Sequence, residues 1–266
     1  MIIMRIHEVR NIPINIISIP LKERWNPVVV LYSKYKIIVR GEINYDYSCM
    51  KSLNGSIPRS LARNLRSFLD SLSNELSIDF CYRVAVEVDD EIRNLRSSIY
   101  VVVSQILFES LLSKLQEKMD PVDIVKSLSV IDNSINTKSQ HIEALRLAYA
   151  INRGVIFRRI DEYIELEDPP RILKLKIKRI YRLKEHQNPL VEGDLGDLLT
   201  KLVGYMIIDL SRDLLDRRYN IFFEKMNYVN RLWSLIYGLP LTNKHYLYDE
   251  WNRVILADIL FSNLDL

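Results

Sequence analysis

The segment from residue 81 to residue 119 constrains the fold more than any other stretch of the chain. In "CYRVAVEVD", the residues Tyr82, Val84, Val86 and Val88 alternate with polar or small residues, which is the pattern of a half-buried strand. After an acidic turn, "SIYVVVSQILFESLLSKLQEKM" is apolar over most of a helical circumference. Such a helix must be buried on most sides, so we expect a mixed α+β fold with this helix at its centre.

The remaining segments supply elements that can surround this helix. Strand patterns occupy residues 26–45 (with a turn-like "YSKYK" inside), 154–166, 171–183 and 252–261, and helical patterns occupy residues 56–76, 120–132, 141–154, 196–218 and 219–238. Asp120 and Gly154 are the expected N-cap and stop of two helices. Residues 167–170, "EDPP", form the expected boundary between an N-terminal domain, 1–168, and a C-terminal domain, 169–266.

Composition indicates a soluble cytoplasmic protein. The formal net charge of +3 does not require a polyanionic partner, and no segment approaches the apolar length of a membrane span. Cys49 and Cys81 show neither metal-ligand spacing nor a disulfide framework, so we expect a reducing environment. We expect no metal site, because no zinc-type spacing links the histidines, His7, His141, His186 and His245.

Glycine is scarce in this chain. Average usage would give roughly 19 glycines, and the sequence has 7. Glycine allows backbone amides to approach a phosphate closely, so the chain has few places for a phosphate-binding loop. The alternative is a helix-rich protein of a thermophile with short, rigid loops.

The turn before the central helix resembles part of a known phosphate loop. The order of elements and the stretch "VEVDDEIRNLRSSIYVVVSQIL" are similar to the GHMP kinase superfamily, and most of all to its archaeal pantoate kinases, where P-x-x-x-G-L-G-S-S opens the helix. Leu95, Ser97 and Ser98 fit that pattern, whereas Asn94 and Arg96 stand where glycines belong. The resemblance implies a two-layer fold with an N-terminal α/β domain and a C-terminal ferredoxin-like α+β domain.

Two further stretches carry the resemblance. "INRGVIFRRIDEYIEL" is similar to the G-G-x-x-x-R strand of the family, with Gly154 and Arg158 matching and Arg153 in place of a glycine. "KHYLYDEWNRVILADIL" is placed like the terminal glycine-rich turn and strand, but only Ala257 fits and no glycine is kept.

The departures from the family pattern predict a degenerate ATP site. Side chains at Asn94 and Arg96 would occupy space that the phosphates need at the helix N-terminus. The three acids at 89–91 would also repel a polyphosphate, although Arg93 and Arg96 offset part of that charge. The plain alternative is a turn in which Ser97 or Asn94 caps the helix.

The catalytic aspartate that the resemblance implies falls, counted without gaps, on Arg146. The nearest carboxylate is Glu143, and an arginine cannot act as the base. The leading hypothesis is therefore a non-catalytic binding or assembly protein that needs no cofactor. The alternative is an active ATP- and Mg²⁺-dependent kinase of a small hydroxy acid, in which Glu143 acts as base. In that case Arg93, Asn94 and Arg96 lie at the phosphates, and Ser97 or Ser98 holds the metal.

The strand at 171–184 is strongly basic. Lys174, Lys176 and Lys178 alternate with apolar residues, and Arg182 follows. Such a stripe can follow a nucleic-acid backbone, which gives a third hypothesis. It is also typical of a protected sheet edge, or of cations paired with the acids just upstream.

The C-terminal region is rich in aromatic residues. Trp233 lies on the apolar face of its helix and is expected in the core, whereas Tyr246, Tyr248 and Trp251 are expected in a loop. Because tyrosine and tryptophan are enriched at interfaces, this loop is a candidate surface for a homodimer or a protein partner. The sequence is also compatible with a protein that binds a small-molecule ligand.

Overall fold

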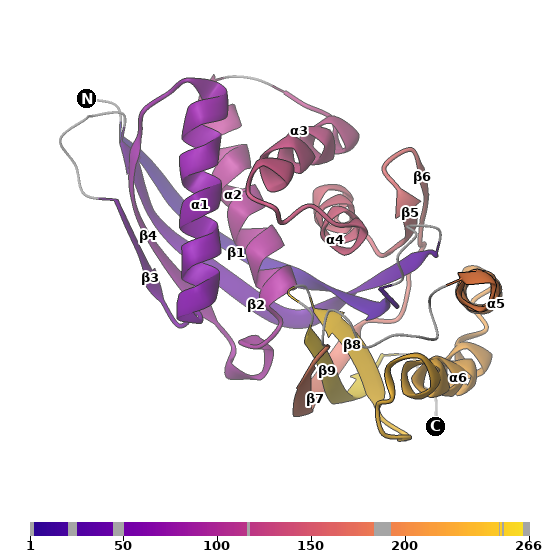
Figure 1. Ribbon diagram of the computed structural model, residues 1–266. Coiled ribbons are helices and arrows are strands. Elements are labelled where there is room, and N and C mark those ends of the chain that lie inside the picture. Colours follow the sequence, from indigo (N-terminus) through magenta and orange to yellow (C-terminus); the bar gives the residue numbers. More distant parts are fainter. Residues whose placement is uncertain are drawn as a thin grey trace.

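Four helices lie over one face of a sheet of long strands, and two further helices pack beside its C-terminal strands (Figure 1). The computed structural model describes residues 3–20, 26–44, 51–115, 118–183, 193–249, 251 and 253–262. The two-layer α+β fold expected from the sequence is confirmed.

The N-terminal part of the sheet is built on an antiparallel pair, β1 (Ile3–Ile17) and β2 (Val28–Asn44). Strand β4 (Cys81–Val88) pairs with β2, and β3 (Ser52–Gly55) lies parallel to β4. The hairpin of β5 (Val155–Arg159) and β6 (Glu162–Glu165) joins through β5 to the start of β2. The turn expected at "YSKYK" is wrong: these residues continue β2, because β1 pairs with both ends of the stretch, at Tyr32 and Lys36, across a local irregularity in the register.

The helical layer consists of α1 (Arg59–Leu76), α2 (Arg96–Leu115), α3 (Pro121–Ser134) and α4 (Gln140–Ile151). Residues 99–103 of α2 are fully buried, as the all-round apolar pattern predicts. Asp120 caps α3 by accepting a hydrogen bond from the Asp123 amide, which confirms that prediction. Helix α4 ends earlier than Gly154, because Asn152 adopts the left-handed conformation and caps it.

The C-terminal part has three strands and two helices (Figure 1). Strands β7 (Ile172–Arg182), β9 (Arg253–Phe261) and β8 (His245–Asp249) are adjacent in that order, and α5 (Gly193–Leu215) and α6 (Tyr219–Tyr237) connect β7 to β8. The two parts of the sheet meet where β2 pairs with β7 at a single position, Ser33 with Ile172. The predicted domain boundary after residue 168 lies between β6 and β7 and stays a prediction.

Cys81, at the start of β4, is disulfide-bonded, whereas the spacing of the cysteines had shown no disulfide framework. The other cysteine of the sequence, Cys49, lies outside the described residues. No helix in the described part of the chain is long and apolar enough to cross a membrane.

Candidate functional site

The turn between β4 and α2 is a short 3-10 helix, η1 (Asp90–Ile92), followed directly by the start of α2. Two of the acids here have local partners: Asp89 accepts a hydrogen bond from the Lys36 amide at 3.2 Å, and exposed Arg93 pairs with Asp90 at 2.7 Å. Arg93 is thus engaged away from the helix start. Asn94 is half-buried and Ser98 is buried.

A carboxylate from another element accepts hydrogen bonds at the N-terminus of α2. The Ser97 amide and the Ser97 hydroxyl both donate to Oδ1 of Asp249, at 2.8 and 2.5 Å, and Arg253 Nη1 donates to Oδ2 at 3.1 Å. Asp249 is the last residue of β8 and Arg253 is the first of β9. Asp249 thus satisfies donors at this helix end from a position more than half the chain away, whereas the sequence had suggested only a local cap by Ser97 or Asn94.

The charges around this carboxylate do not balance. Burial raises the pKa of Asp249, and the Ser97 hydrogen bonds, Arg253 and Arg96 act in the opposite direction. Burial lowers the pKa of Arg253, and the positive charges of Arg96 and Arg182 lower it further. Arg182 lies opposite Arg253 in the β7–β9 ladder. Two guanidinium groups, those of Arg253 and Arg96, therefore act on one carboxylate, with Arg182 opposite Arg253, and the buried Nε of Arg96 has no hydrogen-bond partner among the described residues.

The turn that presents Asp249 is anchored in the core. Trp251 adopts φ 64°, which is unusual for a bulky residue, and its ring meets Tyr100 of α2 edge-to-face at 6.2 Å between centroids. Tyr246 and Tyr248 are buried in β8 instead of lying in an exposed loop. The loop surface expected for a partner is therefore largely packed into the protein. Trp233 is fully buried, as predicted.

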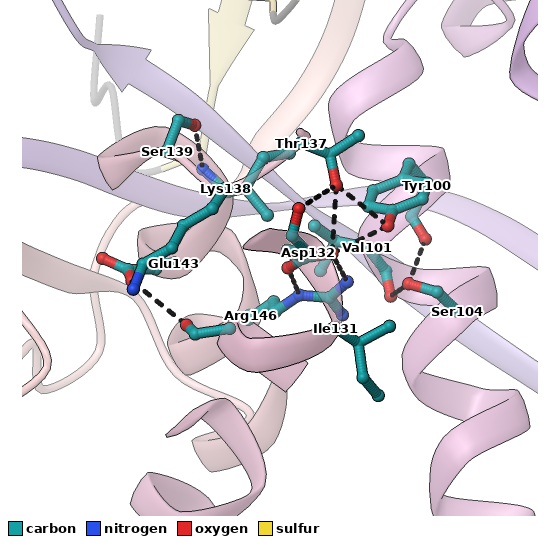
Figure 2. Close-up of polar contacts among 12 residues, drawn as sticks. Tyr100, Val101, Ser104, Ile131, Asp132, Thr137, Lys138, Ser139, Glu143 and Arg146 are labelled. Carbon is teal, nitrogen blue, oxygen red and sulfur yellow. Dashed lines mark hydrogen bonds and ion pairs between the residues drawn. The ribbon is translucent and has the colours of Figure 1, made fainter. Parts of the chain in front are cut away.

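Arg146, at the position that the resemblance gives to the catalytic aspartate, is fully buried in an ion pair. Its Nε and Nη2 donate to the two carboxylate oxygens of Asp132 at 2.6 and 2.8 Å, and the Tyr100 hydroxyl donates to the same carboxylate at 2.7 Å. Figure 2 shows these side chains converging from α4, α3 and α2, with Thr137 beside them. The group joins three helices.

Electrostatics keep Arg146 charged. Burial alone would lower the pKa of Arg146, but the Asp132 carboxylate more than offsets it, so the pKa is raised. The guanidinium carbon also lies 5.7 Å from the centre of the Phe68 ring and 5.4 Å from that of Tyr100. Arg146 is therefore a permanent cation inside the helical layer and cannot accept a proton.

Glu143 faces away from this group. Its Oε1 accepts a hydrogen bond from Ser129 at 3.1 Å and lies 3.8 Å from Lys138 Nζ (Figure 2). Within the described residues it forms no hydrogen bond or ion pair with the start of α2. The structure thus does not bring together the two parts of the predicted kinase site.

The basic strand is β7. Lys178 pairs with Asp258 of β9 at 2.9 Å, whereas Lys174 and Lys176 are exposed. The acids of residues 161–167 pair with arginines instead of with these lysines, so the predicted upstream partners are wrong. Arg182, which had been assigned to this stripe, lies opposite Arg253 in the β7–β9 ladder and lowers the pKa of Arg253.

The histidines described by the structure do not gather around a metal. His141 shares a short hydrogen bond with Ser18, and His245 is half-buried. His186 lies outside the described residues. In the described ranges no group of three potential ligands has the geometry to hold a metal ion.

Comparison with known proteins identifies the architecture. Phosphomevalonate kinase of Streptococcus pneumoniae, in complex with phosphomevalonate and AMPPNP, superposes with a TM-score of 0.60 at 9% identity, covering 96% of this chain and 92% of that one. The chain has the GHMP-kinase fold. Mevalonate kinases of Methanococcus jannaschii (TM-score 0.58, 8% identity, 96% and 90% covered) and Staphylococcus aureus (0.57, 10%, 96% and 90%) are similar as well. No protein-family profile and no curated protein matches the sequence.

Proposed function

We propose that this GHMP-fold protein is a non-catalytic binding or assembly protein whose ATP phosphate site is closed by its own carboxylate. The observation that supports this most is the pair of hydrogen bonds from Ser97 to Asp249 at the N-terminus of α2. In a glycine-poor chain, Asp249 satisfies the same donors and the same positive helix end that a phosphate would use.

A nucleotide phosphate would have to displace this carboxylate or lie next to it. Two like unit charges about 4 Å apart repel by about 4 kcal/mol at an effective dielectric constant of about 20. Displacing Asp249 would break both Ser97 hydrogen bonds and the contact with Arg253. Either route opposes nucleotide binding.

The second support is the absence of a suitable base at Arg146. Phosphotransfer to a hydroxyl uses a carboxylate within hydrogen-bond reach of the acceptor, and here a buried cation bonded to Asp132 takes that position. The fold then provides a surface for binding a partner instead of aligning two substrates for phosphotransfer.

An active ATP-dependent kinase of pantoate kinase type is the competing proposal, and the excess of positive charge favours it. Arg96 and Arg253, which act on Asp249, and Arg182 opposite Arg253 could together accept a polyphosphate if the Asp249 side chain rotated away. Ser97 or Ser98 would then hold Mg²⁺. Glu143 would have to rotate from Ser129 to act as base.

Nucleic-acid binding has weaker support. Lys174 and Lys176 are exposed on β7, but Lys178 is paired with Asp258 and Arg182 lies near Arg253. The stripe therefore offers fewer uncommitted cations than its sequence suggests.

A ligand-dependent melting experiment tests the proposal. A ligand that binds only the native state raises the melting temperature by mass action, so we expect ATP–Mg²⁺ to leave that temperature unchanged. Ser97→Ala, with Ser104→Ala as a control buried in the same helix, tests the site. A shift in the wild-type protein and in Ser104→Ala that Ser97→Ala removes would show that the site binds ATP.

A further inference from the structure

Helix α5 carries an exposed apolar ridge that the described part of the chain leaves uncovered. Leu198, Leu202, Tyr205 and Ile208 follow one another at spacings of four, three and three residues, which keeps them on one face. The exposed fractions of Leu198 and Tyr205 are 63% and 72%. Isolated exposed apolar residues are ordinary, whereas a continuous apolar stripe marks an interaction surface.

A groove lies beside the C-terminal half of the same helix. It is a cavity of about 660 Å³ between α5 and the β5–β6 hairpin. Its apolar lining comes from both elements and from the start of β2: Pro27, Ile156, Tyr163, Ile164, Ile208 and Leu215. The ridge and the groove thus lie on the two halves of one helix, so a single surface carries both a protruding and a receiving part.

These two parts are complementary under a two-fold axis. If two α5 helices pack antiparallel about an axis through Tyr205, each position before Tyr205 faces the position equally far behind it in the other copy. Leu202 then faces Ile208 of the second copy, and Leu198 faces its Arg212. The N-terminal ridge of each copy thereby enters the C-terminal groove of the other.

The charged residues on this face agree with the same arrangement. Lys201 and Asp209 are both exposed and lie four residues on either side of Tyr205, so the axis brings Lys201 of one copy to Asp209 of the other, twice. Asp209 keeps 60% of its side chain exposed even though Lys225 of its own chain contacts it. A like-charged pair at these positions would have opposed the dimer.

We propose that the protein forms a two-fold symmetric homodimer through α5, with the ridge of each copy in the groove of the other. This inference is independent of whether the ATP site is closed, because it uses neither α2 nor β8. It places the partner surface on α5, whereas the sequence had suggested the aromatic C-terminal segment.

Sedimentation velocity over a series of protein concentrations tests the oligomeric state. We expect a dimer of the 266-residue chain, and Leu202→Asp should raise its dissociation constant by about tenfold or more, because the symmetry makes one substitution act twice. Leu241→Asp is the matched control, since Leu241 is 73% exposed and lies on neither the ridge nor the groove. A wild-type protein that stays monomeric, or a dimer equally sensitive to both variants, overturns the proposal.

Two further variants test the register. Lys201→Glu and Asp209→Lys should each weaken the dimer, and the double variant should regain affinity because the charges are again opposite. Tyr205→Cys should give a covalent dimer under mild oxidation, since the axis places the two substituted positions together. A double variant weaker than both single variants, or a Tyr205→Cys protein that forms no covalent dimer, would contradict this arrangement.

Discussion

The buried ion pair of Arg146 and Asp132 offers a quantitative test of the assignment of Arg146 as a structural residue. Both side chains are at most 1% exposed. Replacing Arg146 by methionine keeps most of the volume but leaves the Asp132 carboxylate with only its hydrogen bonds from Tyr100 and Thr137. Breaking such a pair by removing one partner costs about 3–5 kcal/mol.

This loss can be measured by urea unfolding and by calorimetry. At about 2–4 °C per kcal/mol for a protein of this size, we expect the melting temperature of Arg146→Met to fall by about 6–20 °C. The double variant Arg146→Met/Asp132→Leu should lose less than the sum of the two single variants, because it leaves no uncompensated buried charge.

Two results would refute this reasoning. If Arg146→Met unfolds within about 1 kcal/mol of the wild-type protein, the pair does not hold the three helices together. If the double variant loses the full sum, Arg146 and Asp132 are not energetically coupled.

Three other predictions concern the junction of the sheet, a histidine and the basic strand. The hydroxyl of Tyr35 accepts from a β7 amide at 2.9 Å, so Tyr35→Phe leaves that amide unpaired and should cost about 1–3 kcal/mol in urea unfolding. Burial lowers the pKa of His245, so the unfolded chain binds the proton first; stability should fall below about pH 6.5, by at most about 1.4 kcal/mol per pH unit, and His245→Gln should flatten this profile. We expect no strongly salt-dependent binding of DNA or RNA; binding that weakens steeply with salt, and is lost when Lys174, Lys176 and Lys178 are changed to glutamine, would support the nucleic-acid hypothesis.

Elements with local patterns were predictable. The alternation of β4, the amphipathic face of α1 and the all-round apolar pattern of α2 each fix burial within one element. The Asp120 cap is equally local, since it needs only the next turn of the helix. Where the sequence pattern failed, as at "YSKYK" within β2, pairing with β1 at Tyr32 and Lys36 and with β7 at Ser33 overrode the turn preference.

The site depends on contacts that no local pattern reveals. Asp249 and Ser97 lie in different parts of the fold, and their contact requires β8 to end opposite the start of α2. Asp249 and Arg253 are four residues apart, and that acid–base spacing was the available signal. Asp132 was not predicted either, because its partner Arg146 lies on another helix. The scarcity of glycine pointed to the phosphate loop but could not indicate what fills it.

Adding inorganic phosphate to the wild-type protein and to Asp249→Ala tests the central claim most directly. Removing the carboxylate exposes the Ser97 donors and leaves Arg253 without its partner, so the variant should melt lower, and phosphate should restore part of the loss by binding in its place. The wild-type protein should not respond. A wild-type protein that phosphate stabilises, or a folded Asp249→Ala protein that phosphate does not, would contradict the account.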